Sequence, residues 1–338
     1  MTTAATESST GLDPIPETGP PVPTDAVIRK TATSSKAVFF LRDTIEIFKL
    51  RVTAMVVLTA WAGFHLGSVQ SGINSFNATL LDTLLGVALV SGGSSVLNQV
   101  FERRTDAKMR RTAQRPLAAG RMGLLYGVLL GMATIASGSL WLAYRTNPVT
   151  GMLTLLTAVT YVCIYTPLKR YTTLATFIGA FPGAMPPLIG WTAARGAIEW
   201  PAVALFAILF VWQIPHFMAI AWLYREDYGR ASIRMLPVVE PDGWSTAIEA
   251  LIYAILMIPV SLLPYYLHVE GRWYLACATL LGLIYLLYTV RFFRIAHAPK
   301  ASESRSYARA LLKVSVIYLP LLLTVMMLNA HRVKELVP

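Results

Sequence analysis

Charged side chains are scarce in this 338-residue chain, where they make up 14% of the sequence. Typical soluble domains contain about 25% charged residues. Hydrophobic residues account for 55% of the chain, and they form long blocks separated by short polar stretches, which is the pattern of repeated membrane spans. The shortage of charge argues against a soluble protein and predicts an all-α, polytopic bundle of membrane helices.

Cysteine is almost absent, because Cys163 and Cys277 are the only two and both lie inside apolar blocks. Neither their number nor their spacing fits a disulfide framework or a cysteine-based metal site. A signal-peptide pattern is also lacking at the N-terminus. The sequence therefore gives no indication of a disulfide-stabilised secreted protein.

The first 36 residues differ from the rest, since they are rich in Thr, Ser and Pro and contain four acidic side chains. Such a composition cannot build a hydrophobic core. We expect a disordered tail over residues 1–36 and a transmembrane domain over residues 37–338. Acidic residues are also unusual in mitochondrial transit peptides, so a bacterial plasma membrane is the expected location.

About nine segments are long and apolar enough to cross a bilayer as helices. They cover residues 47–67, 80–100, 122–144, 150–168, 174–194, 202–224, 247–267, 273–293 and 311–330. The fifth contains Pro182, Pro186 and Pro187, so we expect its helix to be broken or kinked. A broken helix in a membrane must be covered by protein or border a cavity, whereas a simple proline kink between packed helices is the alternative.

The net charge of +11 comes from basic residues that collect in alternate gaps between the predicted spans. A positive charge of this size can indicate nucleic-acid binding, but the alternation matches the positive-inside rule of membrane proteins. We therefore expect membrane lipid around the helices and no nucleic-acid partner. The same rule places the N-terminus and the basic loops on the cytoplasmic side.

The loop after the second predicted span contains more than topology requires. Asn98, Glu102 and Asp106 are four residues apart, so they lie on one face if the helix continues through them. Their oxygens can hold Mg²⁺, which takes one or two carboxylates together with water and phosphate oxygens. Arg111 and Arg115 follow, and guanidinium suits phosphate. The loop predicts a Mg²⁺–diphosphate site, with a solvated loop of local ion pairs as the plainer alternative.

A second acidic loop strengthens this prediction. Glu226 and Asp227 follow the sixth span, so two halves of four helices would each place carboxylates on the same membrane face. Two such clusters can hold two metal ions on one diphosphate. Lys169 and Arg170 lie in a third loop on that face, where they either anchor the protein at the membrane surface or neutralise a departing diphosphate.

These loops resemble the motifs of the UbiA superfamily of intramembrane prenyltransferases. The first is similar to the long Asn-x-x-x-Asp/Glu-x-x-x-Asp motif, and segments 212–217 and 225–228 resemble the second motif as it occurs in the branch that farnesylates heme. Segments 165–170 and 190–193 also resemble that branch, and the resemblance covers residues 44–330. Members that act on 4-hydroxybenzoate have more aspartates in the second motif, where this chain has Tyr224 and Tyr228.

The resemblance implies a Mg²⁺-dependent transfer of a farnesyl group from farnesyl diphosphate to a vinyl group of heme B, which gives heme O for heme-copper oxidases. It also makes heme A synthase a candidate partner. The residues that it implies for catalysis are Asn98, Glu102, Asp106, Tyr165 and Asp227. Those implied for the metal are Asn98, Glu102, Asp106, Glu226 and Asp227. Those implied for the diphosphate are Arg111, Arg115, Lys169, Arg170 and Arg225.

His216 lies eight positions before Tyr224, which is about 12 Å deeper along a helix. An ionisable residue at that depth is a functional candidate. We expect His216 either to bind heme, through the iron or a propionate, or to be a neutral histidine hydrogen-bonded between helices.

Two other functions remain open from the sequence. One is prenylation of an aromatic quinone precursor by another member of the same superfamily. The other is a non-enzymatic membrane transporter, whose basic loops would only set topology. A transporter should keep ionisable residues along a path through the membrane, whereas the acidic residues here gather near one face.

Overall fold

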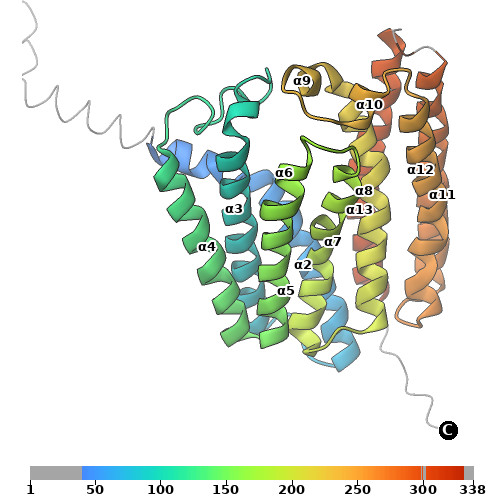
Figure 1. Cartoon of the computed structure of the whole chain (residues 1–338). Helices are drawn as coiled ribbons and strands as arrows, with labels where there is room; N and C mark the ends of the chain where they lie inside the picture. Colours follow the sequence, from blue (N-terminus) through green and yellow to red (C-terminus); the bar gives the residue numbers. More distant parts are fainter. Residues whose placement is uncertain (1–39, 298, 300–301, 331–338) are drawn as a thin grey trace, which may run out of the picture. The chain divides into compact units, whose positions relative to one another are not determined.

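The structure, a computed structural model, describes residues 40–297, 299 and 302–330. These residues form helices and no β-sheet (Figure 1). The long helices are α2 (Leu50–Ser71), α3 (Ala78–Asp106), α4 (Leu124–Arg145), α5 (Pro148–Val159), α7 (Ala175–Arg195), α8 (Trp200–Leu223), α11 (Trp244–Tyr266), α12 (Arg272–Phe292) and α13 (Ser302–Asn329). The short elements are η1 (Thr160–Tyr165), α6 (Thr166–Leu168), α9 (Arg225–Arg230), α10 (Leu236–Val239) and η2 (Phe293–Ala296). The predicted tail over residues 1–36 lies outside the described residues.

In the described part of the chain a helix lies at each of the nine predicted segments, although one of the nine falls short of the apolarity that a membrane span needs. Eight of them are long and apolar enough to cross a membrane, and one of these, Pro148–Leu168, joins α5, η1 and α6. The ninth is α7, which has 21 residues but is diluted by prolines and glycines. The described chain is therefore an all-α, polytopic membrane bundle.

The predicted break in the fifth span is absent, because α7 is one continuous helix with Pro182, Pro186 and Pro187 inside it. Each proline removes a single backbone hydrogen bond, and packed neighbours in a membrane protein can cover the backbone groups that are freed. The expectation that this segment borders a cavity is confirmed, because Pro182 and Pro186 both line one.

Close contact between α2 and α7 depends on glycine. A Cβ atom at Gly63 of α2 would overlap the carbonyl of Pro187, and one at Gly190 of α7 would overlap the carbonyl of Ala60. Small residues of this kind let two membrane helices approach until their backbones touch. Both α2 and α7 also contribute side chains to the wall of one cavity.

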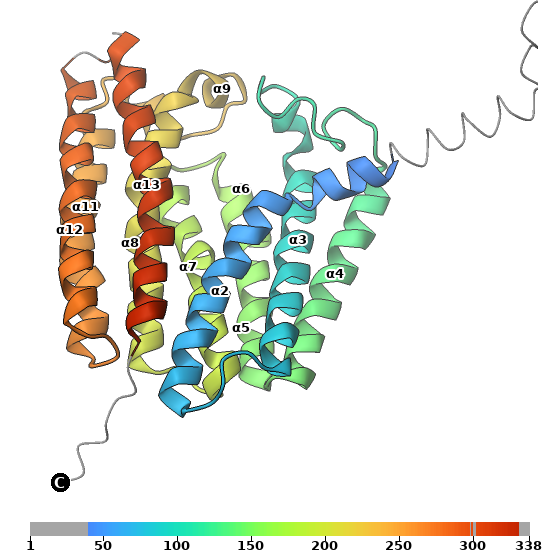
Figure 2. The same cartoon turned by 180° about the vertical axis from the view of Figure 1, so that it is seen from behind.

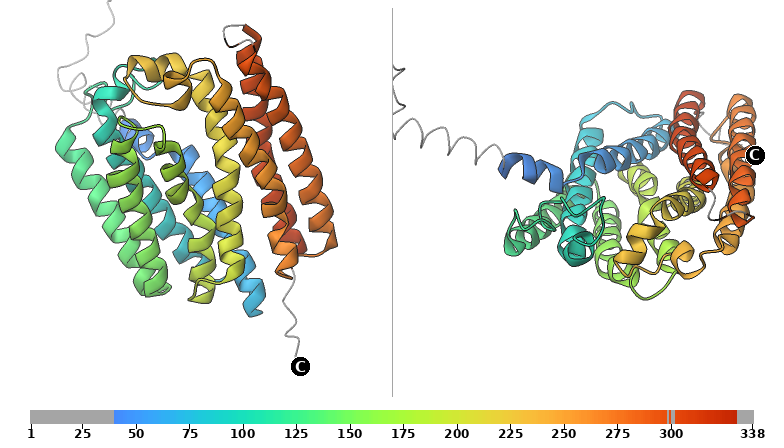
Figure 3. Two further views of the ribbon diagram at one scale, coloured as in Figure 1. Left: turned by 45° about the vertical axis from the view of Figure 1, so that its right-hand side comes forward. Right: turned by 90° about the horizontal axis from the view of Figure 1, so that it is seen from above.

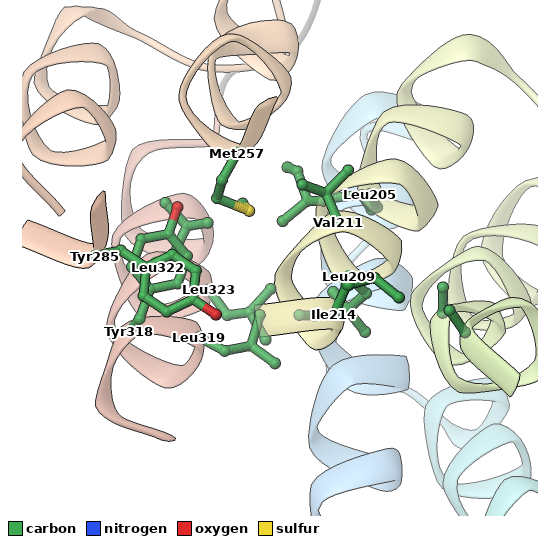
Figure 4. Close-up of a cluster of buried hydrophobic side chains, with 14 of the residues drawn as sticks. Leu205, Leu209, Val211, Ile214, Met257, Tyr285, Tyr318, Leu319, Leu322 and Leu323 are labelled. Atoms are coloured by element: carbon green, nitrogen blue, oxygen red, sulfur yellow. The ribbon is translucent and has the colours of Figure 1, made fainter. Parts of the chain in front are cut away.

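The largest buried cluster joins α8 to α13, α11 and α12. Figure 4 shows Leu209 and Ile214 on one side of this cluster, with Tyr318 and Leu322 on the other. The rings of Tyr285 and Tyr318 stack at 5.1 Å, and Tyr285 donates a hydrogen bond to the carbonyl of Trp212 at 2.9 Å. These contacts fix the rotation of α8 about its axis, which matters because α8 carries His216.

The connections that follow α3, α6 and α8 gather at one end of the helices, and α9 and α10 lie among them (Figures 1 and 2). A view along the helices shows these connections together over the same end (Figure 3, right). They are the basic loops that the alternation of charge assigns to one membrane face. The structure therefore confirms that these loops share one end of the bundle.

Candidate active site

A cavity of about 550 Å³ lies among α2, α3, α5, α7 and α8, at the end where the basic loops gather. Its volume is typical of sites for small organic ligands, which measure about 300–1,000 Å³. We call its charged part the cavity mouth, formed by Lys49, Asn98, Glu102, Asp106, Arg111, Arg115 and Lys169. Apolar side chains line much of the rest, including Val52, Val56, Val87, Val90, Ile189, Phe217 and Ile220.

The face predicted for the first acidic loop is present. Helix α3 continues to Asp106, and Asn98, Glu102 and Asp106 all line the cavity while being 1%, 8% and 1% exposed. Asn98 is oriented by its amide nitrogen, which donates to the Thr166 hydroxyl at 3.1 Å. Its oxygen is thereby left to face the cations of the mouth.

Both carboxylates of the mouth are paired with cations. Asp106 accepts two hydrogen bonds from Nη1 of Arg115, at 2.9 and 2.7 Å, and Glu102 accepts one from Nζ of Lys169 at 3.0 Å. Buried charges need such partners, because an unpaired charge away from water is very costly. Of the residues that the sequence assigned to metal and to diphosphate, Glu102, Asp106, Arg115 and Lys169 therefore lie together in one site.

Lys169 reaches the mouth because of the element before it. The π-helix η1 ends at Tyr165, and Lys169 follows one turn later with its ammonium 4.2 Å from the centre of the Tyr165 ring. Burial acts to lower the pKa of Lys169, but Tyr165 and Glu102 outweigh burial and raise its pKa above the ordinary value. Lys169 thus stays charged, and Tyr165 already holds a cation of the protein with its ring.

Lys49 is a residue of the mouth that the sequence did not single out. Its ammonium donates to Oδ1 of Asn98 at 3.2 Å, and its backbone is in the left-handed region with φ of 49°. Burial and the charge of Arg115 lower the pKa of Lys49 to about 7. The only signal in the sequence is its place at the start of the first predicted span, where any lysine would pass as a membrane anchor.

The first and second loops meet at the mouth. Arg111 donates to the Tyr228 hydroxyl at 3.5 Å and lies 4.6 Å from the centre of the Tyr224 ring. Met109 packs with Tyr228 in a small buried cluster. Tyr228 itself lines the cavity, so α9 contributes an aromatic side chain to the site.

The charged residues beside Tyr228 point elsewhere. Asp227 is paired with Arg230 within α9, and the exposed Glu226 is paired with Arg305 at 2.7 Å. Arg225 donates to the backbone of Trp222 and Pro299, and Arg170 donates to the carbonyl of Phe101. None of the predicted site residues Arg170, Arg225, Glu226 and Asp227 is part of the cavity lining. Their assignment to metal or diphosphate stays a prediction.

His216 lines a deeper part of the same cavity. Its ring stacks on Trp212, with centroids 4.9 Å apart, and its Nδ1 lies 2.7 Å from the Ser315 hydroxyl. The histidine is therefore hydrogen-bonded between helices and also lines the cavity, and its binding to heme stays a prediction.

The described residues contain no group of three or more His, Cys, Asp and Glu side chains placed to hold a metal ion. Mg²⁺ does not need such a group, because it commonly binds through one or two carboxylates with water and phosphate oxygens as its other ligands. Glu102, Asp106 and the Asn98 oxygen supply that smaller donor set on one helix face. The residues of the mouth thus fit Mg²⁺ together with a phosphorylated ligand.

A bundle of membrane helices that encloses a cavity with a charged mouth and apolar walls defines a membrane-embedded binding protein for an amphipathic, anionic ligand. The match to a family model is consistent with that class: residues 55–317 match the UbiA prenyltransferase family. The chain belongs to this family and is a prenyltransferase.

Relatives with similar sequences cover most of the chain. The protoheme IX farnesyltransferase of Koribacter versatilis (strain Ellin345) is 51% identical, over 86% of this chain and 93% of that protein. The protoheme IX farnesyltransferase of Solibacter usitatus (strain Ellin6076) is 43% identical, over 86% of this chain and 99% of that protein.

Solved structures with low sequence identity share the fold. A digeranylgeranylglyceryl phosphate synthase matches with a TM-score of 0.69 at 18% identity, over 86% of this chain and 98% of its own. A UbiA homologue from Archaeoglobus fulgidus, bound to GPP and Mg²⁺, matches with a TM-score of 0.53 at 14% identity, over 82% of this chain and 99% of its own. These likenesses establish the fold alone.

Proposed function

We propose that this prenyltransferase transfers the farnesyl group of farnesyl diphosphate to a vinyl group of heme B and so makes heme O for heme-copper oxidases. The relatives named protoheme IX farnesyltransferase, at 51% and 43% identity, support the choice of substrates. The observation that carries the chemistry is the cavity mouth, where four basic side chains and two carboxylates lie beside an apolar space.

Mg²⁺ is the metal that we propose for the mouth. Asn98, Glu102 and Asp106 would hold it, and it would supply positive charge to the diphosphate oxygens. The UbiA homologue solved with GPP and Mg²⁺ supports a divalent cation in this fold. Glu226 and Asp227 remain proposed metal ligands, and to reach a diphosphate in the cavity they would have to exchange their present arginine partners.

The reaction that we propose begins with loss of diphosphate. The allylic C–O bond breaks and its electron pair leaves with the diphosphate, whose charge is stabilised by Arg111, Arg115 and Lys169. The vinyl π electrons of heme then form the new C–C bond, and water adds to the resulting cation and loses a proton. Apolar walls keep bulk water from the allylic cation, and the rings of Tyr165 and Tyr228 border the mouth where that cation forms.

We also propose an orientation and a location. The mouth lies at the end with the basic loops, which the positive-inside rule assigns to the cytoplasm, so the active site and the N-terminus would face the cytoplasmic side of a bacterial plasma membrane. Heme A synthase is our candidate partner, since a farnesylated heme is more apolar than heme B and is best handed over within the bilayer.

The rival functions have less support. A quinone-precursor prenyltransferase would use the same mouth, and the sequence relatives favour heme over that acceptor. A transporter would need ionisable side chains along a path through the bundle, whereas the acidic and basic side chains lining this cavity all belong to the mouth, apart from His216.

The test is to express the full chain in bacterial cells that make heme B but lack their own heme-farnesylating activity, and to analyse extracted hemes by mass spectrometry. We expect heme O with the wild-type chain and none with a Glu102→Gln variant that still inserts in the membrane. A prenylated quinone precursor without heme O would support the rival prenyltransferase, and no prenylated product would contradict both.

A further inference from the structure

His216 has no part in the proposed bond breaking, yet contacts with two other side chains fix the orientation of its ring at the cavity wall. Trp212, one turn earlier on α8, stacks on it at an interplanar angle of 21°. Ser315 of α13 contacts its Nδ1 at 2.7 Å, and the carbonyl of Ser315 accepts a hydrogen bond from Nε1 of Trp212 at 2.9 Å. One residue of α13 therefore fixes both rings.

The Ser315 hydroxyl determines which ring nitrogen of His216 carries hydrogen. That hydroxyl has a single proton, and it donates the proton to the carbonyl of Leu312 at 2.7 Å. With that proton on the Leu312 side, the hydroxyl oxygen accepts from His216, and this arrangement assigns the ring hydrogen to Nδ1. In the neutral ring the lone pair of Nε2 is then bare, and among the described residues none hydrogen-bonds to Nε2.

A bare Nε2 on a cavity wall selects between the two contacts open to a heme. It has no hydrogen to donate, so it cannot bind a propionate carboxylate unless the ring gains a proton, and no described carboxylate contacts the ring to stabilise that charge. It is a good donor to iron, because imidazole suits first-row transition metals. Histidine ligands also commonly donate their other N–H to a fixed acceptor, as Nδ1 does here.

We propose that Nε2 of His216 binds the iron of the acceptor heme as an axial ligand, and that Ser315 positions the ring for this contact. The inference rests on the proposed function, in which heme is the acceptor. This ligation would place the two substrates in different parts of the cavity. The iron is held at the depth of His216 on α8, and the mouth stays free for the diphosphate and its metal.

The experiment compares two tetrapyrroles that differ in the metal. The purified full chain in lipid nanodiscs is titrated with heme B and, separately, with metal-free protoporphyrin IX, with absorption and electron paramagnetic resonance spectra recorded for the heme. We expect a nitrogen-ligated heme spectrum for the wild type. His216→Ala should lower the heme B affinity by about tenfold or more and leave the protoporphyrin IX affinity within about twofold, and added imidazole should restore the spectrum.

Two further variants separate ligation from packing. Ser315→Ala removes the acceptor of Nδ1 but keeps the ring, so it should shift the iron–nitrogen stretch in resonance Raman spectra and weaken heme B binding by about tenfold without changing protoporphyrin IX binding. His268→Gln, at an exposed histidine outside the cavity lining, is the matched control and should behave as wild type.

Several outcomes would overturn the inference. One is a wild-type heme spectrum in His216→Ala, and another is an equal loss of affinity for both tetrapyrroles, which would mean that the ring only packs against the macrocycle. If the chain makes heme O while its heme spectrum is independent of His216, the ligation fails and the proposed function stands. If the chain binds no heme and makes no heme O, both fail.

Discussion

Asp106 and Asp82 offer a matched pair of single carboxylates on α3. Each is bound to an arginine, Asp106 to Arg115 at 2.7 Å and Asp82 to Arg145 at 3.2 Å, but they lie at opposite ends of the helix. If Asp106 binds metal at the mouth, Asp106→Asn should lower farnesyl transfer by about 100-fold or more, as the loss of a group that stabilises developing charge does. Asp82→Asn should leave the rate within about twofold, and equal effects of the two changes would contradict the metal assignment.

The carboxyl group of Glu270 should make the stability of the fold depend on pH, independently of the residues at the cavity mouth. It is buried in the connection between α11 and α12, and among the described residues none hydrogen-bonds its carboxyl oxygens. Burial raises the pKa of Glu270 from 4.5 to about 9. Between these two values the folded chain binds more protons than the unfolded one, so stability should fall as pH rises through this window, by up to about 1.4 kcal/mol per pH unit.

Thermal unfolding of the detergent-solubilised protein between pH 5 and pH 9 measures this slope. Glu270→Gln should flatten it and make the variant more stable than wild type at pH 9. Glu199 is a control of opposite sign, because the hydrogen bond from Arg195 lowers its pKa. Glu199→Gln should leave the slope of the alkaline part of the curve unchanged, although the whole of that part should lie lower because the ion pair with Arg195 is lost. An unchanged slope in Glu270→Gln would show that the carboxyl is ionised in the folded state.

A residue of the site could be predicted when its partners lie close to it in the sequence, and could not be predicted when they lie far away. Asn98, Glu102 and Asp106 follow a spacing of four within one helix, so local geometry alone brings them together. Lys49 and Ser315 offer no such pattern, because each reaches its partner only through packing between helices far apart in the sequence. The orientation of α9, which turns Tyr228 rather than Asp227 to the cavity, likewise depends on tertiary contacts.

At the level of elements, the contact between α2 and α7 can be tested with one methyl group. Gly190→Ala places a Cβ against the carbonyl of Ala60, where backbone must move. We expect a loss of about 1–3 kcal/mol in stability, as is usual for overpacking, and a larger loss of activity because α7 walls the cavity. The measurement is thermal unfolding together with heme O production.

The control for this change is Gly123→Ala at the start of α4. A Cβ there meets nothing within 4 Å, and the φ of Gly123 is −69°, which suits alanine. This variant should unfold within about 0.5 kcal/mol of wild type, as surface substitutions usually do. Similar behaviour of the two variants would mean that α2 and α7 are not in close contact.

Helix positions were the most predictable part of the fold, because a bilayer requires long apolar segments and the chain supplies them. Two features of single elements were not predictable. The π-helical turn of η1 lies inside an otherwise regular apolar span, and nothing in its composition marks it. The continuity of α7 through three prolines depends on the neighbours that cover it.

For the whole molecule, the orientation in the membrane can be measured with single cysteines. In a background with Cys163 and Cys277 changed to serine, Lys108→Cys marks the loop at the mouth and Ala197→Cys marks the opposite connection, and both positions are exposed. A membrane-impermeant thiol reagent added outside intact cells should label position 197 and not position 108. The reverse result would invert the proposed topology and place the active site outside.

The ion pairs at the mouth mean that neither the proposed metal nor the proposed diphosphate should bind well alone. Mg²⁺ by itself must displace Lys169 and Arg115 from their carboxylates, and diphosphate by itself meets those carboxylates still charged. When they arrive together, the carboxylates can turn to the metal while Lys169 and Arg115 turn to the diphosphate, so each of the four side chains keeps an oppositely charged partner.

Calorimetry with geranyl diphosphate should therefore give an affinity at least about tenfold higher with Mg²⁺ than without it, and linkage requires the same factor for Mg²⁺. Equal affinities would contradict the exchange. A prenyl alcohol brings no charge that could replace the salt bridges of the mouth. The empty mouth should therefore reject the alcohol whatever the length of its hydrocarbon chain.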